Sequence, residues 1–162
     1  NCTMKKMRVA IIGQGRSGRD IHGAFMLSEL NDICEVVAVV DALEDRRERA
    51  KAEFGCDVYA DYRELFNRKD IDVIVNASFS HMHYAIAKDC LQHGYNVLNE
   101  KPFAKTIYEC MDLMKTAKDN GDKYSFRIAL ELAVKGKAQE ICMKLWHSVI
   151  ELFTGRTVVY PD

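Results

Sequence analysis

Residues 9–18 read Val-Ala-Ile-Ile-Gly-Gln-Gly-Arg-Ser-Gly, an apolar run of strand length that leads directly into a Gly-x-Gly-x-x-Gly pattern. An amphipathic segment with apolar residues at helical spacing begins near Ser17. The pattern predicts a strand, a tight turn and a helix in succession. Each glycine has its own role, because Gly13 permits the turn, Gly15 lets the backbone approach a pyrophosphate, and Gly18 lets the helix pack closely on the strand.

Three glycines after a strand often form only a turn, so the loop needs a second sign of ligand binding. Asp41 supplies one, because it closes the next apolar run at the distance where a carboxylate accepts hydrogen bonds from adenosine ribose hydroxyls. The exposed start of the helix also favours an anionic phosphate. We therefore predict a dinucleotide site that includes Asp41 and the loop residues Gly13, Gln14, Gly15, Arg16, Ser17 and Gly18.

The segment after Asp41 bears on which dinucleotide binds. Residues 44–54 mix acidic and basic side chains at helical spacing, and Gly55 follows them, which predicts a solvated helix with a glycine cap. Arg46 or Arg47 could instead reach the 2′-phosphate of NADP. Asp41 would repel that phosphate, so NAD is favoured as the cofactor and NADP is the alternative.

Apolar runs and helical segments alternate along most of the chain. This alternation predicts an α/β fold with a doubly wound parallel Rossmann sheet, whose right-handed connections give the strand order 3-2-1-4-5-6. Helices are expected from Ser17 to about Leu30 and from an N-cap at Ser80 through Gln92. The six strands are expected at about 7–12, 35–40, 57–60, 72–77, 95–98 and 123–128.

Composition narrows the range of partners. The chain has 162 residues, 48% of them hydrophobic, which suits one ordinary domain with an appendage. Lys and Arg total 23 against 24 for Asp and Glu, so no strong field favours nucleic acid or an anionic membrane. No apolar stretch approaches the ~20 residues of a membrane span, and no secretory signal is visible. We expect a soluble cytoplasmic protein.

Cysteines and histidines give no pattern typical of a metal site. The six cysteines contain no Cys-x-x-Cys pair, so reduced thiols are expected. His22, His81, His93 and His147 have no ligand-like spacing with carboxylates or cysteines. We assign no metal.

The second informative stretch is Asn99-Glu100-Lys101-Pro102, at the carboxyl end of the fifth predicted strand. In a doubly wound sheet this edge faces the nicotinamide end of a bound dinucleotide. Lys101 is the candidate catalytic residue, because an ammonium can hydrogen-bond a carbinol oxygen and stabilise developing negative charge there. The alternative interpretation is that Glu100 and Lys101 are ordinary loop charges before a proline that ends the strand.

Together these features resemble the glucose-fructose oxidoreductase, inositol dehydrogenase and MocA family. The shared pattern is the glycine loop, Asp41, the segment 76–83 and Glu100-Lys101-Pro102, over about residues 7–128. Members oxidise or reduce sugars, cyclitols and related carbinols with NAD or NADP, and they join a Rossmann domain to a larger substrate domain. The resemblance implies that Glu100 lies near the nicotinamide ribose and that Lys101 contacts a sugar or polyol substrate.

The match changes after the fourth predicted strand. Family members usually have Thr-Pro or a close variant there, with a histidine four residues after the proline. Here Ser78-Phe79 replaces the pair, and His83 keeps the histidine. The resemblance implies that Ser78 and His83 border the cofactor, although a lone histidine in this position is more often a helix-surface or supporting residue.

Part of the family's substrate apparatus is not visible in this sequence. Members follow the sixth strand with a substrate domain that carries an aspartate and a histidine a few residues apart. After Ile128 the only histidine is His147 and the only aspartate is Asp162, so this pattern is absent. We expect a Rossmann domain at 4–128 without its substrate domain, binding dinucleotide with little or no activity alone. The alternative is a sugar or cyclitol dehydrogenase completed by another chain.

Residues 129–162 are expected to form a helical tail and a short strand. From Ala138 to Phe153 apolar residues recur at helical spacing around Trp146, and residues 157–160 suit a strand. An apolar stripe of this kind predicts a homodimer through the tail. The alternative is that the stripe covers a face of the chain's own sheet.

Overall fold

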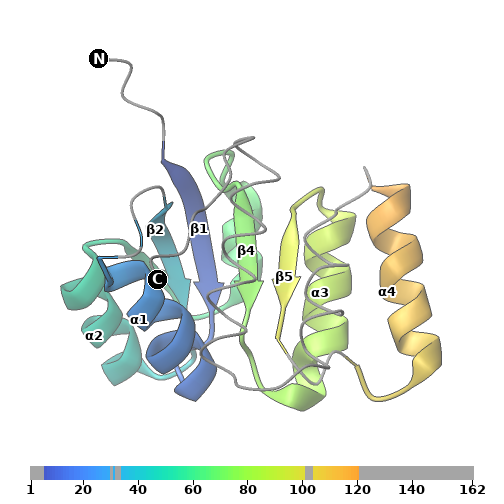
Figure 1. Ribbon diagram of the computed structural model, residues 1–162, viewed down its shortest axis with the longest axis horizontal. Coiled ribbons are helices and arrows are strands. Elements are labelled where there is room, and N and C mark those ends of the chain that lie inside the picture. The colour runs from blue at the N-terminus through green and yellow to red at the C-terminus, as the bar shows by residue number, and fades with distance from the viewer. Residues whose placement is uncertain (1–5, 30, 32–33, 101–103, 121–162) are drawn as a thin grey trace, which may run out of the picture.

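The structure is a computed structural model that describes residues 6–29, 31, 34–100 and 104–120. In these ranges five parallel strands form one sheet in the order β3-β2-β1-β4-β5, with helices on both faces (Figure 1). This confirms the α/β class and the order of the first five strands. The strands are β1 (Met7–Ile12), β2 (Cys34–Val40), β3 (Asp57–Tyr59), β4 (Val73–Asn76) and β5 (Val97–Asn99).

The helical segments connect successive strands. They comprise one π-helix, two 3₁₀ segments and four α-helices: η1 (Arg16–Gly23), α1 (Ala24–Leu27), α2 (Glu44–Phe54), η2 (Tyr62–Asn67), η3 (Ser80–Met82), α3 (His83–Gln92) and α4 (Ile107–Asp119). In Figure 1, α1 and α2 lie beside β1 and β2, whereas α3 and α4 lie beside β5. The two pairs of helices belong to opposite faces of the sheet, as the core residues show.

Central strand β1 contributes to two apolar cores. Val9 and Ile11 pack in a cluster with Phe25 of α1 and Ala50 of α2. Ala10 and Ile12, which point to the other face, pack in a cluster with side chains of α3 and α4. Strands buried on both faces explain why these runs are almost continuously apolar in the sequence.

Local chemistry accounts for several helix ends. Helix α2 begins with Glu44 and Asp45 in its first turn and ends at Gly55, whose φ of 62° is the left-handed conformation of a C-terminal cap. Helix α4 begins after Thr106, whose side chain accepts a hydrogen bond from the backbone N–H of Glu109. The end of α2 at Gly55 confirms the glycine cap that the sequence predicted.

Two other predicted helix ends were wrong. The helix expected to reach Leu30 ends at Leu27, where the Ser28 hydroxyl donates to the carbonyl of Phe25 at 2.7 Å and the chain turns extended. Ser80 does not cap a long helix, because it begins the 3₁₀ segment η3, and α3 starts at His83 without a side-chain cap. Serine hydroxyls compete for backbone groups in turns as well as at caps, which makes such ends hard to predict.

Several predictions fall on residues that the structure does not describe. These are the sixth strand at 123–128, the tail at 129–162 with its homodimer, and the catalytic residue Lys101. They remain predictions. In the described ranges, no helix has both the length and the apolar character needed to cross a bilayer.

Candidate functional site

The glycine loop between β1 and η1 lies at the carboxyl edge of the sheet. Gly13 has a φ of 96°, and a Cβ there would lie 2.4 Å from the carbonyl oxygen of Ala77. A Cβ on Gly18 would lie 1.8 Å from the carbonyl oxygen of Gly13. Both glycines are therefore required by the protein's own packing, whether or not a ligand binds.

Gly15 differs from its two neighbours. A Cβ there would meet only the Arg46 guanidinium, at 3.7 Å, among the atoms within 4 Å. The packing of the protein leaves room for a side chain at this position. A glycine that the fold itself does not need suits a backbone that a ligand approaches closely.

The same loop contains polar atoms that lack partners. In the described part of the chain, the buried side-chain atoms without a hydrogen bond are Oε1 of Gln14 and Oγ of Ser17. Gln14 donates through Nε2 to the carbonyl of Gly13 at 3.1 Å, which leaves its amide oxygen as the orphan. Burying such groups unpaired is costly, so they suit a polar ligand that bonds to them.

These residues line a cavity of about 460 Å³. Its walls are residues 12–17 of the loop, 40–43 after β2 and 77–80 after β4, with Tyr62 and Met82 at the side. Parallel strands bring these three chain segments to one edge, where doubly wound sheets bind ligands. Burial and a hydrogen bond to Asp89 raise the pKa of Tyr62 to about 12, so this wall carries a neutral phenol.

Asp41 lies at one end of this cavity. Its Oδ2 accepts the backbone N–H of Gln14 at 2.8 Å, and its Oδ1 accepts that of Leu43 at 2.9 Å. The carboxylate thus joins the glycine loop to the start of α2 while facing the cavity. A carboxylate has about four acceptor positions, so ribose hydroxyls can bond to it in addition to the two backbone groups.

The two arginines considered for a 2′-phosphate have different surroundings. Arg46 lines the cavity, with Nη1 at 3.7 Å from Oδ2 of Asp41. Arg47 donates through Nη1 to the carbonyl oxygens of Asp41 and Ala42, both at 2.8 Å. Of the two guanidinium groups, that of Arg46 therefore borders the cavity beside the Asp41 carboxylate.

A buried polar network joins the ends of β4 and β5. Asn76 donates through Nδ2 to Oδ1 of Asn99 at 2.8 Å and to the carbonyl of His83 at 3.0 Å. Its own Oδ1 accepts from the Ser78 hydroxyl at 2.7 Å. The ring of His83 reaches back to the carbonyl of Ser78, with Nε2 at 2.7 Å. This network fixes the loop that follows β4.

The structure separates the two residues predicted to border the cofactor after β4. Ser78 lines the cavity. His83 is 2% exposed and lies behind the cavity wall, where it supports Ser78. Direct contact between His83 and a cofactor stays a prediction. The contacts described here are those of a residue that supports the loop, which was the alternative interpretation of this histidine.

Glu100 follows β5 and meets a residue that the sequence analysis did not select. The Nε2 of His22, on the π-helix η1, contacts Oε1 of Glu100. His22 is completely buried, and the Glu100 side chain is 18% exposed. No spacing in the sequence relates these two positions. The available signal was a histidine four residues after Gly18, on the inward face of the predicted helix.

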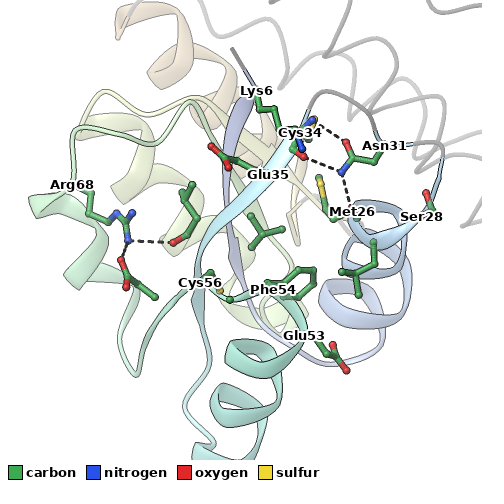
Figure 2. Close-up of a pocket in the computed structure, with 15 residues that line it drawn as sticks. Lys6, Met26, Ser28, Asn31, Cys34, Glu35, Glu53, Phe54, Cys56 and Arg68 are labelled. Carbon is green, nitrogen blue, oxygen red and sulfur yellow. Dashed lines mark hydrogen bonds and ion pairs between the residues drawn. The ribbon is translucent and has the colours of Figure 1, made fainter. Parts of the chain in front are cut away.

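A second cavity, of about 590 Å³, lies at the opposite edge, near the amino end of β2 (Figure 2). Several of its polar groups are paired with one another. Asn31 bonds to the carbonyls of Met26 and Cys34, and Arg68 pairs with Asp57. Burial raises the pKa of the Cys56 thiol to about 11, which disfavours a reactive thiolate. Among the residues that line this hollow, the structure shows no buried side-chain atom without a hydrogen bond, in contrast to the first cavity.

No group of three metal-binding side chains occurs in the ranges that the structure describes. The polar groups at the first cavity are instead backbone N–H groups, serine hydroxyls, the Gln14 amide and the Asp41 carboxylate. These donors and acceptors, with the open position at Gly15, fit a phosphate joined to a ribose, which is the central part of a dinucleotide.

Known proteins resemble this chain over the same region. Residues 7–127 match the family described as an oxidoreductase family with an NAD-binding Rossmann fold. A 2,7-anhydro-N-acetylneuraminate hydratase of Mediterraneibacter gnavus is 29% identical over 118 residues, which cover 73% of this chain and 30% of the relative. Inositol 2-dehydrogenase 1 of Saccharopolyspora erythraea is 36% identical over 110 residues, covering 67% of this chain and 32% of the relative.

Solved structures agree with this match. The myo-inositol 2-dehydrogenase of Lactobacillus plantarum superimposes with a TM-score of 0.65 at 27% identity, over 72% of this chain and 34% of its own. KijD10, a 3-ketoreductase of Actinomadura kijaniata in complex with NADP, has a TM-score of 0.66 at 25% identity, over 72% and 37%. The chain spans about a third of the length of these relatives. It belongs to the glucose-fructose oxidoreductase, inositol dehydrogenase and MocA family of oxidoreductases, and residues 7–127 carry the family's NAD-binding Rossmann fold.

Proposed function

We propose that this chain binds NAD(H) at the cavity beside the glycine loop and has little or no turnover alone. The observation that carries the proposal is Gly15, which the fold leaves open beside the orphaned polar atoms of Gln14 and Ser17. In the proposed complex the pyrophosphate lies over Gly15 at the start of η1. The adenosine ribose bonds to Asp41.

NAD is proposed over NADP because the Asp41 carboxylate faces the position of the ribose hydroxyls. Its charge would repel a 2′-phosphate, although Arg46 offsets part of that charge from 3.7 Å. Relatives use both dinucleotides: KijD10 was solved with NADP, and the WlbA dehydrogenase of Bordetella pertussis, 25% identical, was solved with NADH. The balance between Asp41 and Arg46 is therefore the feature to test.

At the other end of the cofactor, Glu100 is proposed to border the nicotinamide ribose and Lys101 to contact a sugar or polyol. Bound NAD supplies a hydride acceptor for a carbinol carbon. A lysine at the substrate oxygen would hydrogen-bond it and stabilise the negative charge that develops there. Within residues 129–162 no aspartate lies a few residues from a histidine, so we propose little or no turnover for residues 1–162 by themselves.

The alternative is an NAD-dependent sugar or cyclitol dehydrogenase whose pocket is completed by another chain. The predicted homodimer through the 138–153 segment is one way to supply a second chain. A cytoplasmic location is also part of the proposal, and four free thiols, at Cys34, Cys56, Cys90 and Cys110, support it.

Calorimetric titration of the wild-type chain with NADH and NADPH tests the proposal. Gly15→Val should abolish NADH binding, with at least a ~100-fold loss of affinity, because its side chain occupies the space of the pyrophosphate. The melting temperature should stay close to wild type, since the Arg46 guanidinium is the only neighbouring group within 4 Å of the added Cβ. Unchanged NADH affinity in Gly15→Val would refute the assignment.

Ala52→Val is the matched control, because it adds bulk on the exposed face of α2 and should leave NADH affinity unchanged. A screen of polyols and sugars for absorbance of the reduced nicotinamide separates the two candidate functions. Binding without turnover supports the proposal. Robust turnover by the isolated chain supports the dehydrogenase instead.

A further inference from the structure

We propose that His22 is a positioning residue for the nicotinamide half of the site. Its imidazole holds the Glu100 carboxylate, and this carboxylate in turn orients the nicotinamide ribose. The inference rests on the proposed function. It assigns a role to a buried histidine that neither the glycine pattern nor the Glu-Lys-Pro segment includes.

The position of His22 follows from the packing of η1. Gly18, His22 and Gly23 are the buried residues of this π-helix, so they define its inward face. Gly18 lets the helix lie directly against the carbonyl of Gly13, where any Cβ would collide. Four residues later the same face carries His22 to the carboxyl edge of the sheet. π-Helical turns occur frequently at functional sites, and here one lies immediately after the predicted phosphate loop.

Both the side chain and the backbone of Glu100 make contacts with other described residues. Its side chain meets His22 through Oε1, and its backbone N–H donates to the carbonyl of Asn76 at 3.1 Å. A glutamate side chain loses considerable rotamer freedom when a ligand orders it. Because His22 already restrains the carboxylate, that cost is reduced before the ribose arrives.

The contact with His22 does not by itself use all the acceptor positions of the Glu100 carboxylate. A carboxylate has two oxygens with about four acceptor positions, and the contact with one imidazole nitrogen uses one of them. A ribose hydroxyl can therefore donate to the same carboxylate while His22 fixes its orientation. The Glu100 side chain is also 18% exposed, whereas that of His22 is fully buried. Glu100 is therefore the member of the pair that a ligand can reach.

Through helix η1, the contact between His22 and Glu100 also links the nicotinamide half of the proposed site to the phosphate loop. Helix η1 offers Ser17 to the pyrophosphate near its first turn and His22 to Glu100 near its last. One short rigid element thus sets the distance between the phosphate subsite and the nicotinamide subsite. Loss of the His22 contact should disturb the nicotinamide half and leave the adenosine half unchanged.

Two probes separate these halves. NADH carries the nicotinamide ribose, and ADP carries only the adenosine and the diphosphate. His22→Leu removes the imidazole nitrogen with little change in volume and should weaken NADH binding about tenfold, as expected for one hydrogen bond to a charged group. ADP affinity should stay within about twofold of wild type. Bound NADH should also show a lower fluorescence anisotropy, because its nicotinamide is less restrained.

His22→Gln is the conservative rescue, since its amide nitrogen lies near the place of the imidazole Nε2. It should keep NADH affinity within about threefold of wild type. If His22→Leu does not fold, His22→Asn replaces it, because the shorter amide falls short of Glu100. In a Glu100→Gln background the effect of His22→Leu or His22→Asn on NADH affinity should largely disappear, since His22 acts through that carboxylate.

Each other result overturns the inference. Equal losses of NADH and ADP affinity would make His22 a purely structural residue. Unchanged NADH affinity in the variant that lacks the contact would remove its role altogether. Wild-type protein that binds neither probe would refute the proposed function itself, whereas wild type that binds ADP as tightly as NADH would refute only the role of the His22 and Glu100 pair.

Discussion

The adenosine half and the nicotinamide half of the proposed dinucleotide site are built in different ways. The adenosine half uses the glycine loop and Asp41, which contact each other directly through the Gln14 backbone. The residues proposed to recognise the adenosine and its phosphates follow the neighbouring strands β1 and β2. The nicotinamide half depends on side chains that meet from distant parts of the chain, including Asn76, Asn99 and the contact between His22 and Glu100. The first half is therefore formed by residues near one another in the sequence, whereas the second forms only when the sheet brings distant residues together.

This difference governs what a substitution should do. A change in the adenosine half alters ligand contacts one at a time, since Gly15 and Arg46 border open space. A change in the nicotinamide half breaks a network whose members satisfy one another, so it costs stability as well as affinity. Three substitutions test this contrast.

Gly18→Ala should have the largest effect, because Gly18 serves both halves. Its added Cβ would lie 1.8 Å from the carbonyl oxygen of Gly13, so the loop and η1 must move apart. We expect a loss of about 4 kcal/mol in the free energy of unfolding, at the upper end for one substitution. Binding of both NADH and ADP should be lost together. Chemical denaturation and calorimetry provide the two measurements.

The control for this change is Gly23→Ala in the same helix. There the nearest atoms to an added Cβ are at 3.1 Å, one of them on the Phe54 ring, so small shifts can accommodate it. Its stability should stay within about 1 kcal/mol of wild type. If the Gly18→Ala protein is as stable as the Gly23→Ala protein, the two halves of the site do not depend on the close approach of η1 to the Gly13 carbonyl.

Asn76→Ala should break the nicotinamide half alone. It leaves the Ser78 hydroxyl, the Asn99 amide oxygen and the His83 carbonyl without the partner that Asn76 provides. We expect a loss of about 3 kcal/mol in stability, since buried polar groups become unpaired. NADH affinity should fall further than ADP affinity. Asn96→Ala, at the other end of the neighbouring strand, removes one bond to the Asp72 carbonyl and should leave the affinity ratio unchanged.

Arg46→Ala should have the smallest effect and should act only on the adenosine half. Removal of this guanidinium exposes a bound 2′-phosphate to the full charge of Asp41, so NADPH affinity should fall about fivefold. NADH affinity should change by less than about twofold. Arg63→Ala is the control, because that side chain is 66% exposed and pairs with Asp61, whereas Arg46 pairs with Asp41. Equal losses for both dinucleotides would remove Arg46 from cofactor selection.

Much of the fold and of the adenosine half could be predicted from sequence, because the determining residues are neighbours in the chain. Continuous apolar runs identified the buried parallel strands, and the glycine loop with Asp41 identified the cavity edge. The π-helical form of η1 could not be predicted, since π-helical turns are rare and the short segment after the glycine loop carries no pattern that distinguishes one from an α-helix. The contact between His22 and Glu100 could not be predicted either, because it depends on how closely Gly18 lets a helix approach a strand.

The central position of β1 has a consequence for synthesis of the chain. β1 leaves the ribosome before the other strands of the described sheet and can pair with β2 soon afterwards, but its other edge stays unpaired until β4 is made. The turn at Gly13 also remains incompletely packed until Ala77 is made. Ala77 packs against Gly13 and donates its backbone N–H to the Ile12 carbonyl. A nascent chain that ends before Ala77 therefore exposes an apolar strand edge, the kind of surface that chaperones bind. Translation beyond this point closes the sheet and buries that edge.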